Sequence, residues 1–194
     1  MQVAILKYNA GNTRSVRFAF ERLGAEVIVT ADEAQLRAAD RVVFPGVGHA
    51  RSAMNYLKVH RLDELLCDLS QPVLGICLGL QLMCQHSEEG DTDCLGIFPI
   101  SVKRFPKSDL KVPHMGWNLL QPTPANSFSS IQKESAYYFV HSYYAETHPE
   151  FTLAEGNYGT PFSAILRKNN FWAMQFHPEK SSTEGEALLK SFLE

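Results

Sequence analysis

The sequence has little cysteine, no surplus of basic charge and no long apolar run. Four cysteines in 194 residues are too few to indicate a disulfide-stapled secreted scaffold. The formal net charge of −3 gives no electrostatic reason to expect nucleic acid or an anionic membrane as a partner. No segment approaches the ~20 consecutive apolar residues that span a bilayer. These features do not exclude a small or neutral molecule as the ligand.

The amino-terminal residues do not resemble an export signal. The apolar run after Met1 is short and ends at Lys7, whereas a signal peptide combines a basic start with a longer apolar stretch. We therefore expect a cytoplasmic protein. Because the cytosol is reducing, Cys67, Cys77, Cys84 and Cys94 are expected to be free thiols. Any cysteine with a special role must then be distinguished by its reactivity.

The hydrophobic pattern divides the chain into two parts. Up to about residue 90, short β-branched runs alternate with helical patterns, and the runs are apolar throughout. Such strands, separated by helices, are typical of a parallel sheet covered on both faces. The predicted strands are 3–7, 26–30, 41–44 and 72–76, and the predicted helices are 13–23, capped by Asn12 or Thr13, then 33–38, 51–58, 62–69 and 78–85.

After Gly90 the segments are shorter and turn residues separate them. The predicted strands are 101–105, 137–144, 151–154, 162–167 and 171–176, with a closing helix over 184–193. No repeat, charge block or long linker interrupts the chain. The sequence therefore predicts one α/β domain over residues 1–194, with a parallel core and an antiparallel β extension in the C-terminal half.

The stretch 72–81 is the most informative part of the sequence. A predicted strand runs straight into a helix that begins at Leu78, and Cys77 lies at the junction between Gly75 and Gly79. This is a nucleophile elbow with sulfur in place of a serine oxygen, because the strained turn leaves no room for a Cβ at the flanking glycines. The helix N-terminus favours a thiolate, and the amide of Leu78 can donate to an oxyanion. The alternative is a buried structural cysteine.

A thiol nucleophile needs a base, and one of the seven histidines stands out. His177 ends a predicted strand, Pro178 fixes the turn, and Glu179 follows. Positions two apart on an extended segment point the same way, so Glu179 can orient the imidazole while its other nitrogen faces Cys77. The alternative is a histidine with an ordinary place in the core or on the surface.

The segment 45–48, Pro-Gly-Val-Gly, follows the third predicted strand. Ligands of open parallel sheets bind beyond the carboxyl ends of the strands, so this loop and the one at Cys77 are expected to converge. We interpret the segment as a second oxyanion donor, through the amide of Val47 or Gly48. A phosphate cradle is an alternative, although the longer glycine pattern and the lysine of such loops are missing. A plain turn is another.

Together these motifs resemble the triad (class I) glutamine amidotransferases, and the resemblance covers essentially the whole chain. Three further segments, Pro113–Asn118, Tyr138–Tyr144 and His177–Ser182, resemble the glutaminase subunits of imidazole glycerol phosphate synthase. One departure is Leu80, where methionine is common. A change of this kind should only repack a pocket wall.

The resemblance implies a flavodoxin-like fold with no cofactor and no metal. It implies hydrolysis of L-glutamine through a thioester, and transfer of ammonia to a cyclase subunit that makes imidazole glycerol phosphate and aminoimidazole carboxamide ribotide in histidine biosynthesis. By similarity, Gln81 and Glu89 contact glutamine, and the backbone around Ser142 and Tyr143 holds its carboxylate. The alternative for Glu89 is simple solvation within a charged run.

The resemblance also points to a contact surface for the cyclase subunit. The expected interface residues are His114, Met115, Trp117, Asn118 and Lys180. An exposed tryptophan is a typical interface anchor. The alternative is a core tryptophan.

Three other functions remain as alternatives. One is the glutaminase subunit of another synthase, such as anthranilate or pyridoxal phosphate synthase. Another is a cysteine peptidase or a redox-sensing thiol protein. The third is a metal-binding module that uses Cys77, Cys84, His86 and Cys94, although their spacing fits no familiar zinc pattern.

Overall fold

The chain is built around one large mixed sheet, in a computed structural model that describes residues 1–107, 109–123, 131 and 135–194. The sheet has eight strands in the order β2-β1-β3-β4-β14-β13-β12-β9. Its strands are β1 (Gln2–Leu6), β2 (Glu26–Thr30), β3 (Arg41–Gly46), β4 (Val73–Cys77), β9 (Gln121–Pro122), β12 (Thr152–Asn157), β13 (Pro161–Lys168) and β14 (Phe171–Met174).

The first five strands of this order are parallel and the rest are antiparallel. Parallel pairing joins β2 to β1, β1 to β3, β3 to β4 and β4 to β14. With β14 as the fifth strand, the order is the 2-1-3-4-5 of flavodoxin-like folds. Antiparallel pairing then adds β13, β12 and β9. The prediction of a parallel core with an antiparallel extension is confirmed.

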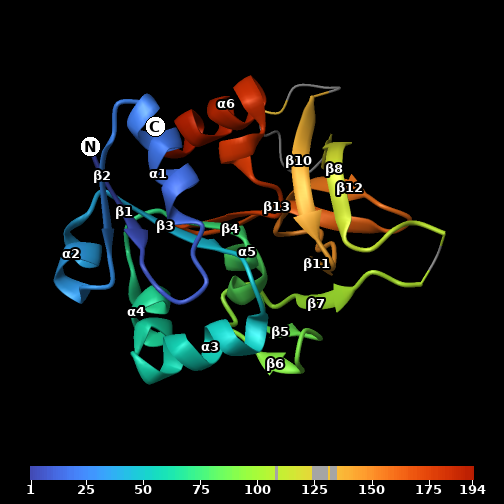
Figure 1. Ribbon diagram of the computed structural model, residues 1–194, viewed down its shortest axis with the longest axis horizontal. Helices are drawn as coiled ribbons and strands as arrows, with labels where there is room; N and C mark the ends of the chain where they lie inside the picture. Colours follow the sequence, from blue (N-terminus) through green and yellow to red (C-terminus); the bar gives the residue numbers. More distant parts are fainter. Residues whose placement is uncertain (108, 124–130, 132–134) are drawn as a thin grey trace.

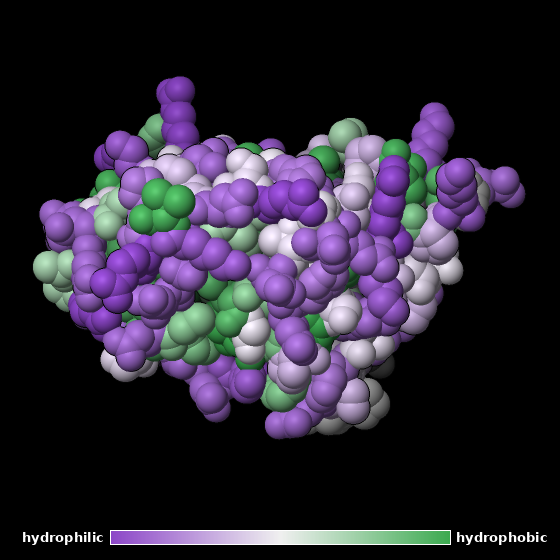
Figure 2. All heavy atoms as spheres, turned by 90° about the horizontal axis from the view of Figure 1, so that it is seen from below, coloured by the Kyte–Doolittle hydropathy of each residue, from purple (hydrophilic) through white to green (hydrophobic). Residues whose placement is uncertain are grey.

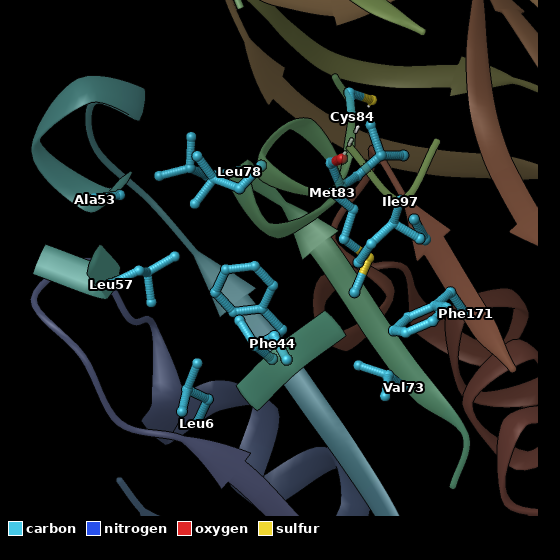
Figure 3. Close-up of a cluster of buried hydrophobic side chains, with 14 of the residues drawn as sticks. Leu6, Phe44, Ala53, Leu57, Val73, Leu78, Met83, Cys84, Ile97 and Phe171 are labelled. Atoms are coloured by element: carbon cyan, nitrogen blue, oxygen red, sulfur yellow. Dashed lines mark hydrogen bonds between the residues drawn. The ribbon is translucent and has the colours of Figure 1, made fainter. Parts of the chain in front are cut away.

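Helices cover both faces of the parallel part (Figure 1). They are α1 (Thr13–Arg22), α2 (Glu33–Ala38), α3 (Ala50–Val59), α4 (Leu62–Asp68), α5 (Leu78–Met83) and α6 (Ser182–Leu193), with a 3-10 turn η1 (Pro178–Lys180). Alternate residues of β1 serve the two faces: Val3 and Ile5 pack with α1 and α6, and Ala4 and Leu6 pack with α3, α4 and α5. Figure 3 shows the hydrophobic cluster on the face of Ala4 and Leu6, where side chains from strands and helices meet around Phe44.

Two smaller sheets stand beside the antiparallel part of the large one (Figure 1). One pairs β8 (His114–Leu119) with β10 (Ala136–His141). The other has the order β11-β7-β5-β6 and contains β5 (His86–Ser87), β6 (Thr92–Asp93), β7 (Ser101–Arg104) and β11 (Tyr143–Ala145). The single strand predicted over 137–144 is thus two strands in different sheets, and β5, β6 and β8 were not predicted.

Near Cys77, the ends of one strand and one helix differ from the prediction. Strand β3 does not stop before Pro45 but continues to Gly46, with Pro45 opposite Ile76 and Gly46 opposite Cys77. The amide of Val42 donates toward β4, so by alternation the nitrogen of Pro45 faces β1, whose pairing has already ended. Because Pro45 has no neighbouring strand on that side, its missing N–H costs no hydrogen bond between strands. Helix α5 ends at Met83 rather than at 85.

The surface on the side of α3 is mostly hydrophilic. Figure 2 shows polar side chains over most of this face, with hydrophobic ones scattered between them. In the part of the chain that the structure describes, no helix has the length and apolar character needed to cross a membrane.

Candidate active site

Cys77 lies at a strained turn between β4 and α5. Its φ of 55° and ψ of −106° lie in a region that non-glycine residues rarely adopt. The flanking glycines make this turn possible, because a Cβ at Gly79 would overlap the carbonyl oxygen of Phe44 and one at Gly75 would come within 2.8 Å of the sulfur of Met83. The sequence therefore forces the thiol to project at the end of the strand.

His177 reaches the same place from β14. The amide of His177 donates to the carbonyl of Tyr138 at 2.9 Å, which fixes the segment against β10. Nδ1 of the imidazole lies 2.9 Å from Oε1 of Glu179, and both side chains are almost fully buried. The thiol of Cys77 lies close enough to the imidazole of His177 to raise its pKa. Cys77, His177 and Glu179 thus form one series, although Cys77 is a hundred residues away from His177 in the sequence.

This series changes the protonation of the imidazole. Burial by itself lowers the pKa of His177, but hydrogen bonds to Cys77 and Glu179, together with the negative charges of these groups, outweigh burial and raise the pKa to about 10. At neutral pH the imidazole therefore carries a proton that it can give to a leaving group.

A cleft with a volume of about 350 Å³ opens at Cys77. Such a volume suits a small polar molecule of amino-acid size. Segments far apart in the sequence supply its walls. They contribute Val47, Gly48, Cys77, Leu78, Gln81, Glu89, Pro113, Val140, His141, Ser142, Tyr143, His177 and Lys180. All residues predicted to bind glutamine or its oxyanion line this cleft.

The backbone amides predicted to stabilise an oxyanion differ in whether they already donate a hydrogen bond within the chain. The amide of Val47 donates to the carbonyl of Ala10 at 2.6 Å, so it is already occupied and is not an oxyanion donor in this conformation. Gly48 has a φ of 117° and its amide has no acceptor among the described residues. Leu78 is the first residue of α5, where amides lack an intrahelical acceptor.

Gln81 and Gln175 form a buried amide pair beside Cys77. Nε2 of Gln81 donates to the carbonyl of Tyr143 at 2.8 Å and to Oε1 of Gln175 at 3.1 Å. Both of its N–H groups are therefore engaged, and Oε1 is the polar atom left for a ligand. Gln175 was not predicted as a site residue. Its place two residues before His177 was the available signal.

Glu89 is more than a solvated surface carboxylate. It lines the cleft, and its Oε2 accepts a hydrogen bond from the amide of Ala50 at 2.7 Å. Ala50 begins α3 and follows closely on the loop that contains Gly48. A carboxylate at a helix N-terminus is favourable for both the helix dipole and the unpaired amides.

A pair of buried histidines lies behind the cleft. His141 Nδ1 is 2.8 Å from the carbonyl of Tyr143, and its Nε2 is 3.0 Å from Nδ1 of His114. Since a carbonyl only accepts, His141 donates through Nδ1 and accepts through Nε2 from His114. Burial lowers the pKa of His114 to about 4 and that of His141 to about 3, so both are neutral.

The structure places only some of the expected interface residues on the surface. His114 is only 3 % exposed, so its side chain does not lie on the surface where it was predicted; the alternation of β8 turns it inward. Met115, Trp117 and Leu119 point outward and are each more than half exposed. The alternative of a core tryptophan is thus wrong. Asn118 is half-buried and donates to the carbonyl of Asn157, and Lys180 lines the cleft.

Among the described residues, no three His, Cys, Asp or Glu side chains are grouped so that they could hold a metal ion. Cys84 is buried and donates to the carbonyl of Leu80. His86 pairs with Asp91 instead. The four residues weighed as a metal-binding module do not form one.

Comparisons with known proteins agree with this fold and cleft. The family model for glutamine amidotransferase class-I matches residues 4–194. A solved structure described as a glutamine amidotransferase superposes with a TM-score of 0.71 at 21 % identity, covering 98 % of this chain and 96 % of the other.

Close relatives in sequence narrow the family further. Imidazole glycerol phosphate synthase subunit HisH of Bacteroides thetaiotaomicron is 56 % identical over the full length of both chains. The HisH subunit of Idiomarina loihiensis is 53 % identical, covering all of this chain and 98 % of the relative. The chain therefore belongs to the class I glutamine amidotransferases and, within them, to the HisH subunits of imidazole glycerol phosphate synthase.

Proposed function

We propose that the chain hydrolyses L-glutamine to glutamate and ammonia through a thioester on Cys77. The observation that carries the proposal is the series of Cys77, His177 and Glu179 at the edge of a cleft of amino-acid size, in which His177 is hydrogen-bonded to Glu179 and interacts with Cys77. The family assignment supports the same chemistry.

The reaction begins with attack by the Cys77 thiolate on the carboxamide carbon of glutamine. The C–S bond forms and negative charge collects on the carboxamide oxygen. His177 then gives its proton to the nitrogen, the C–N bond breaks, and ammonia leaves a glutamyl thioester. Water, deprotonated by the now neutral imidazole, attacks the thioester and releases glutamate and Cys77. Glu179 keeps the imidazole oriented through Nδ1.

We propose that stabilisation of the oxyanion controls the rate of glutamine hydrolysis. The amide of Leu78 is one donor, and a peptide of the 45–48 loop is the second. While the Val47 amide is bonded to Ala10, it cannot be this second donor. Removal of one such donor costs on the order of 10²- to 10³-fold in rate. We propose that the partner and its substrate turn this peptide, so that the isolated chain works slowly.

The cleft recognises the amino-acid end of glutamine with groups of matching chemistry. The carboxylate of Glu89 and the free Oε1 of Gln81 suit the α-ammonium group. The backbone around Ser142 and Tyr143 lies on the cleft wall and suits the α-carboxylate.

The proposed partner is the cyclase subunit of imidazole glycerol phosphate synthase, in a heterodimer in the cytoplasm. The names of the relatives support a synthase partner. Met115, Trp117 and Leu119 form the outer surface of β8, which we call the β8 face. Asn118 lies on the same strand, and Lys180 lies in η1, which contacts β10, the strand paired with β8. Three large exposed apolar side chains on one strand suit a protein contact. Ammonia would pass across this contact to the cyclase, which uses it to make imidazole glycerol phosphate and aminoimidazole carboxamide ribotide.

The test is glutamate production from glutamine, with and without the cyclase subunit. We expect substantial turnover only in the complex, and none in a Cys77→Ala control. Equal rates with and without the cyclase would refute control through the oxyanion loop. Pull-down with an anthranilate synthase component as the competing bait tests the choice of partner, and preferential capture of that bait would contradict it.

A further inference from the structure

Sheet register places Gln175 next to the reactive sulfur. Strands β14 and β4 are parallel neighbours, and Met174 is opposite Ile76. One residue further along come Gln175, just beyond the end of β14, and Cys77, the last residue of β4. On the other side of β4, Gly46 is opposite Cys77 and brings no side chain. Of these two positions beside Cys77 in the sheet, the one that carries a side chain is therefore Gln175.

The side-chain amide of Gln175 has one orientation that satisfies its neighbours. Gln81 points an N–H at Gln175, because its Nε2 lies 3.1 Å from Oε1 of Gln175. The oxygen of Gln175 therefore faces Gln81, and its NH2 group faces Cys77, with Nε2 3.8 Å from Sγ. Gln175 is completely buried, so water does not compete for either contact.

The sulfur has few groups that can donate to it. The carbonyl of Val140, 3.8 Å away, can only accept from a thiol. Among the described residues, the side chain of Gln175 donates to the sulfur, and the N–H of the protonated His177 is the other donor close to it. Once the thiol loses its proton, these donors gain strength and the contact with Val140 becomes unfavourable.

We propose that Gln175 is a positioning residue for the nucleophile: it donates a hydrogen bond to the sulfur of Cys77 while its carbonyl locks the amide of Gln81. The chain from the Tyr143 carbonyl through Gln81 and Gln175 to Cys77 ties the substrate-binding wall to the sulfur. This inference rests on the proposed role of Cys77 and adds a residue to it. A purely structural amide would instead leave the reactivity of the thiol unchanged.

The test measures how alkylation of Cys77 by iodoacetamide depends on pH, in the full chain. Mass spectrometry of the peptide that contains Cys77 separates it from the other thiols. Gln175→Met keeps the length of the side chain and removes both polar atoms. We expect the pH midpoint of alkylation to rise by about one unit, equivalent to about 1.4 kcal/mol. Gln175→Glu keeps the acceptor for Gln81 but places an oxygen beside the sulfur, and should raise the midpoint at least as far.

Apart from the carboxyl that Gln175→Glu adds, the titrating groups around the sulfur are the same in all variants: His177 with Glu179, Tyr8, and His141 on the cleft wall. A matched control is Gln71→Met, since Gln71 also donates a hydrogen bond, to the carbonyl of Leu36, far from the site. Its midpoint should equal that of the unchanged chain. Thermal unfolding of each variant checks that it is folded.

An unchanged midpoint in folded Gln175→Met or Gln175→Glu protein overturns the inference. Alkylation does not require glutamine, so this result is separate from the glutaminase assay. If Cys77→Ala abolishes glutamate production while Gln175→Met keeps the original midpoint, the proposed function stands and only the role of Gln175 falls.

Discussion

The carboxylate of Glu89 accepts a hydrogen bond from the amide of Ala50 at 2.7 Å. It therefore joins a wall of the glutamine cleft to the start of α3, just beyond the proposed oxyanion loop. Under the proposed function, this one carboxylate has two tasks: it offers charge to glutamine, and it holds the end of the loop in place.

Two substitutions of Glu89 separate these tasks. Glu89→Gln keeps an acceptor for Ala50 but loses the charge, so we expect KM for glutamine to rise by about tenfold or more, because a hydrogen bond to a charged group is worth ~1.5–3 kcal/mol. Glu89→Ala also removes the helix cap, worth ~1 kcal/mol, and should lower kcat as well. Steady-state kinetics in the complex measure both. Equal kcat for the two variants would argue against the second task.

The stability of the chain should fall in alkaline solution through His177. Its pKa is raised to about 10 in the folded chain, against an ordinary value of ~6.5 when unfolded. A raised pKa stabilises the folded state fully below pH ~6.5, and this contribution is lost as the pH rises toward 10. We expect the difference in urea midpoint between the unchanged chain and His177→Gln to shrink over this range. A difference that is constant with pH would contradict the assignment.

Gly79→Ala should destabilise the fold far more than an ordinary glycine substitution. Its Cβ would overlap the carbonyl oxygen of Phe44 in the neighbouring strand, and backbone cannot move aside cheaply. Gly24→Ala is the control, since its Cβ would meet nothing within 4 Å and its cost is that of a positive φ, ~1–2 kcal/mol. We expect more than ~3 kcal/mol for Gly79→Ala. Urea unfolding measures both, and similar values would show that the elbow can relax.

Trp117→Ser should weaken binding to the cyclase subunit and leave the fold intact. Trp117 is 56 % exposed on the β8 face, and buried aromatic anchors typically contribute ~2 kcal/mol or more at an interface. We therefore expect about a 30-fold weaker Kd, measured by isothermal titration calorimetry. Phe18→Ser changes another exposed aromatic, on α1, and should not affect the Kd. Equal affinity for both variants would move the interface elsewhere.

Local patterns explain which parts of the site could be predicted from the sequence. The elbow at Cys77 depends on two glycines close in sequence, and His177 and Glu179 pair because they are only two residues apart, although Glu179 lies in the 3-10 turn η1 and not in the extended segment that was predicted. Both are properties of a few consecutive residues. The parallel core likewise follows from uninterrupted apolar runs.

Long-range contacts explain what the sequence left undetermined. The contact of Gln175 with Cys77 follows from the register between two strands far apart in the chain. The amide of Val47 is occupied because the segment at Ala10 passes beside it. The inward position of His114 follows from the face that β8 turns to the core, which its short alternation did not reveal.

The neutral histidine pair has a consequence for the fate of the product. His141 lines the cleft, but its one proton is committed to the carbonyl of Tyr143 and its other nitrogen is already occupied by His114. An amine released beside it meets an imidazole with no acid to offer. If the cleft releases ammonia as proposed, this wall leaves the ammonia uncharged, which is the form that can attack an electrophile in the next reaction.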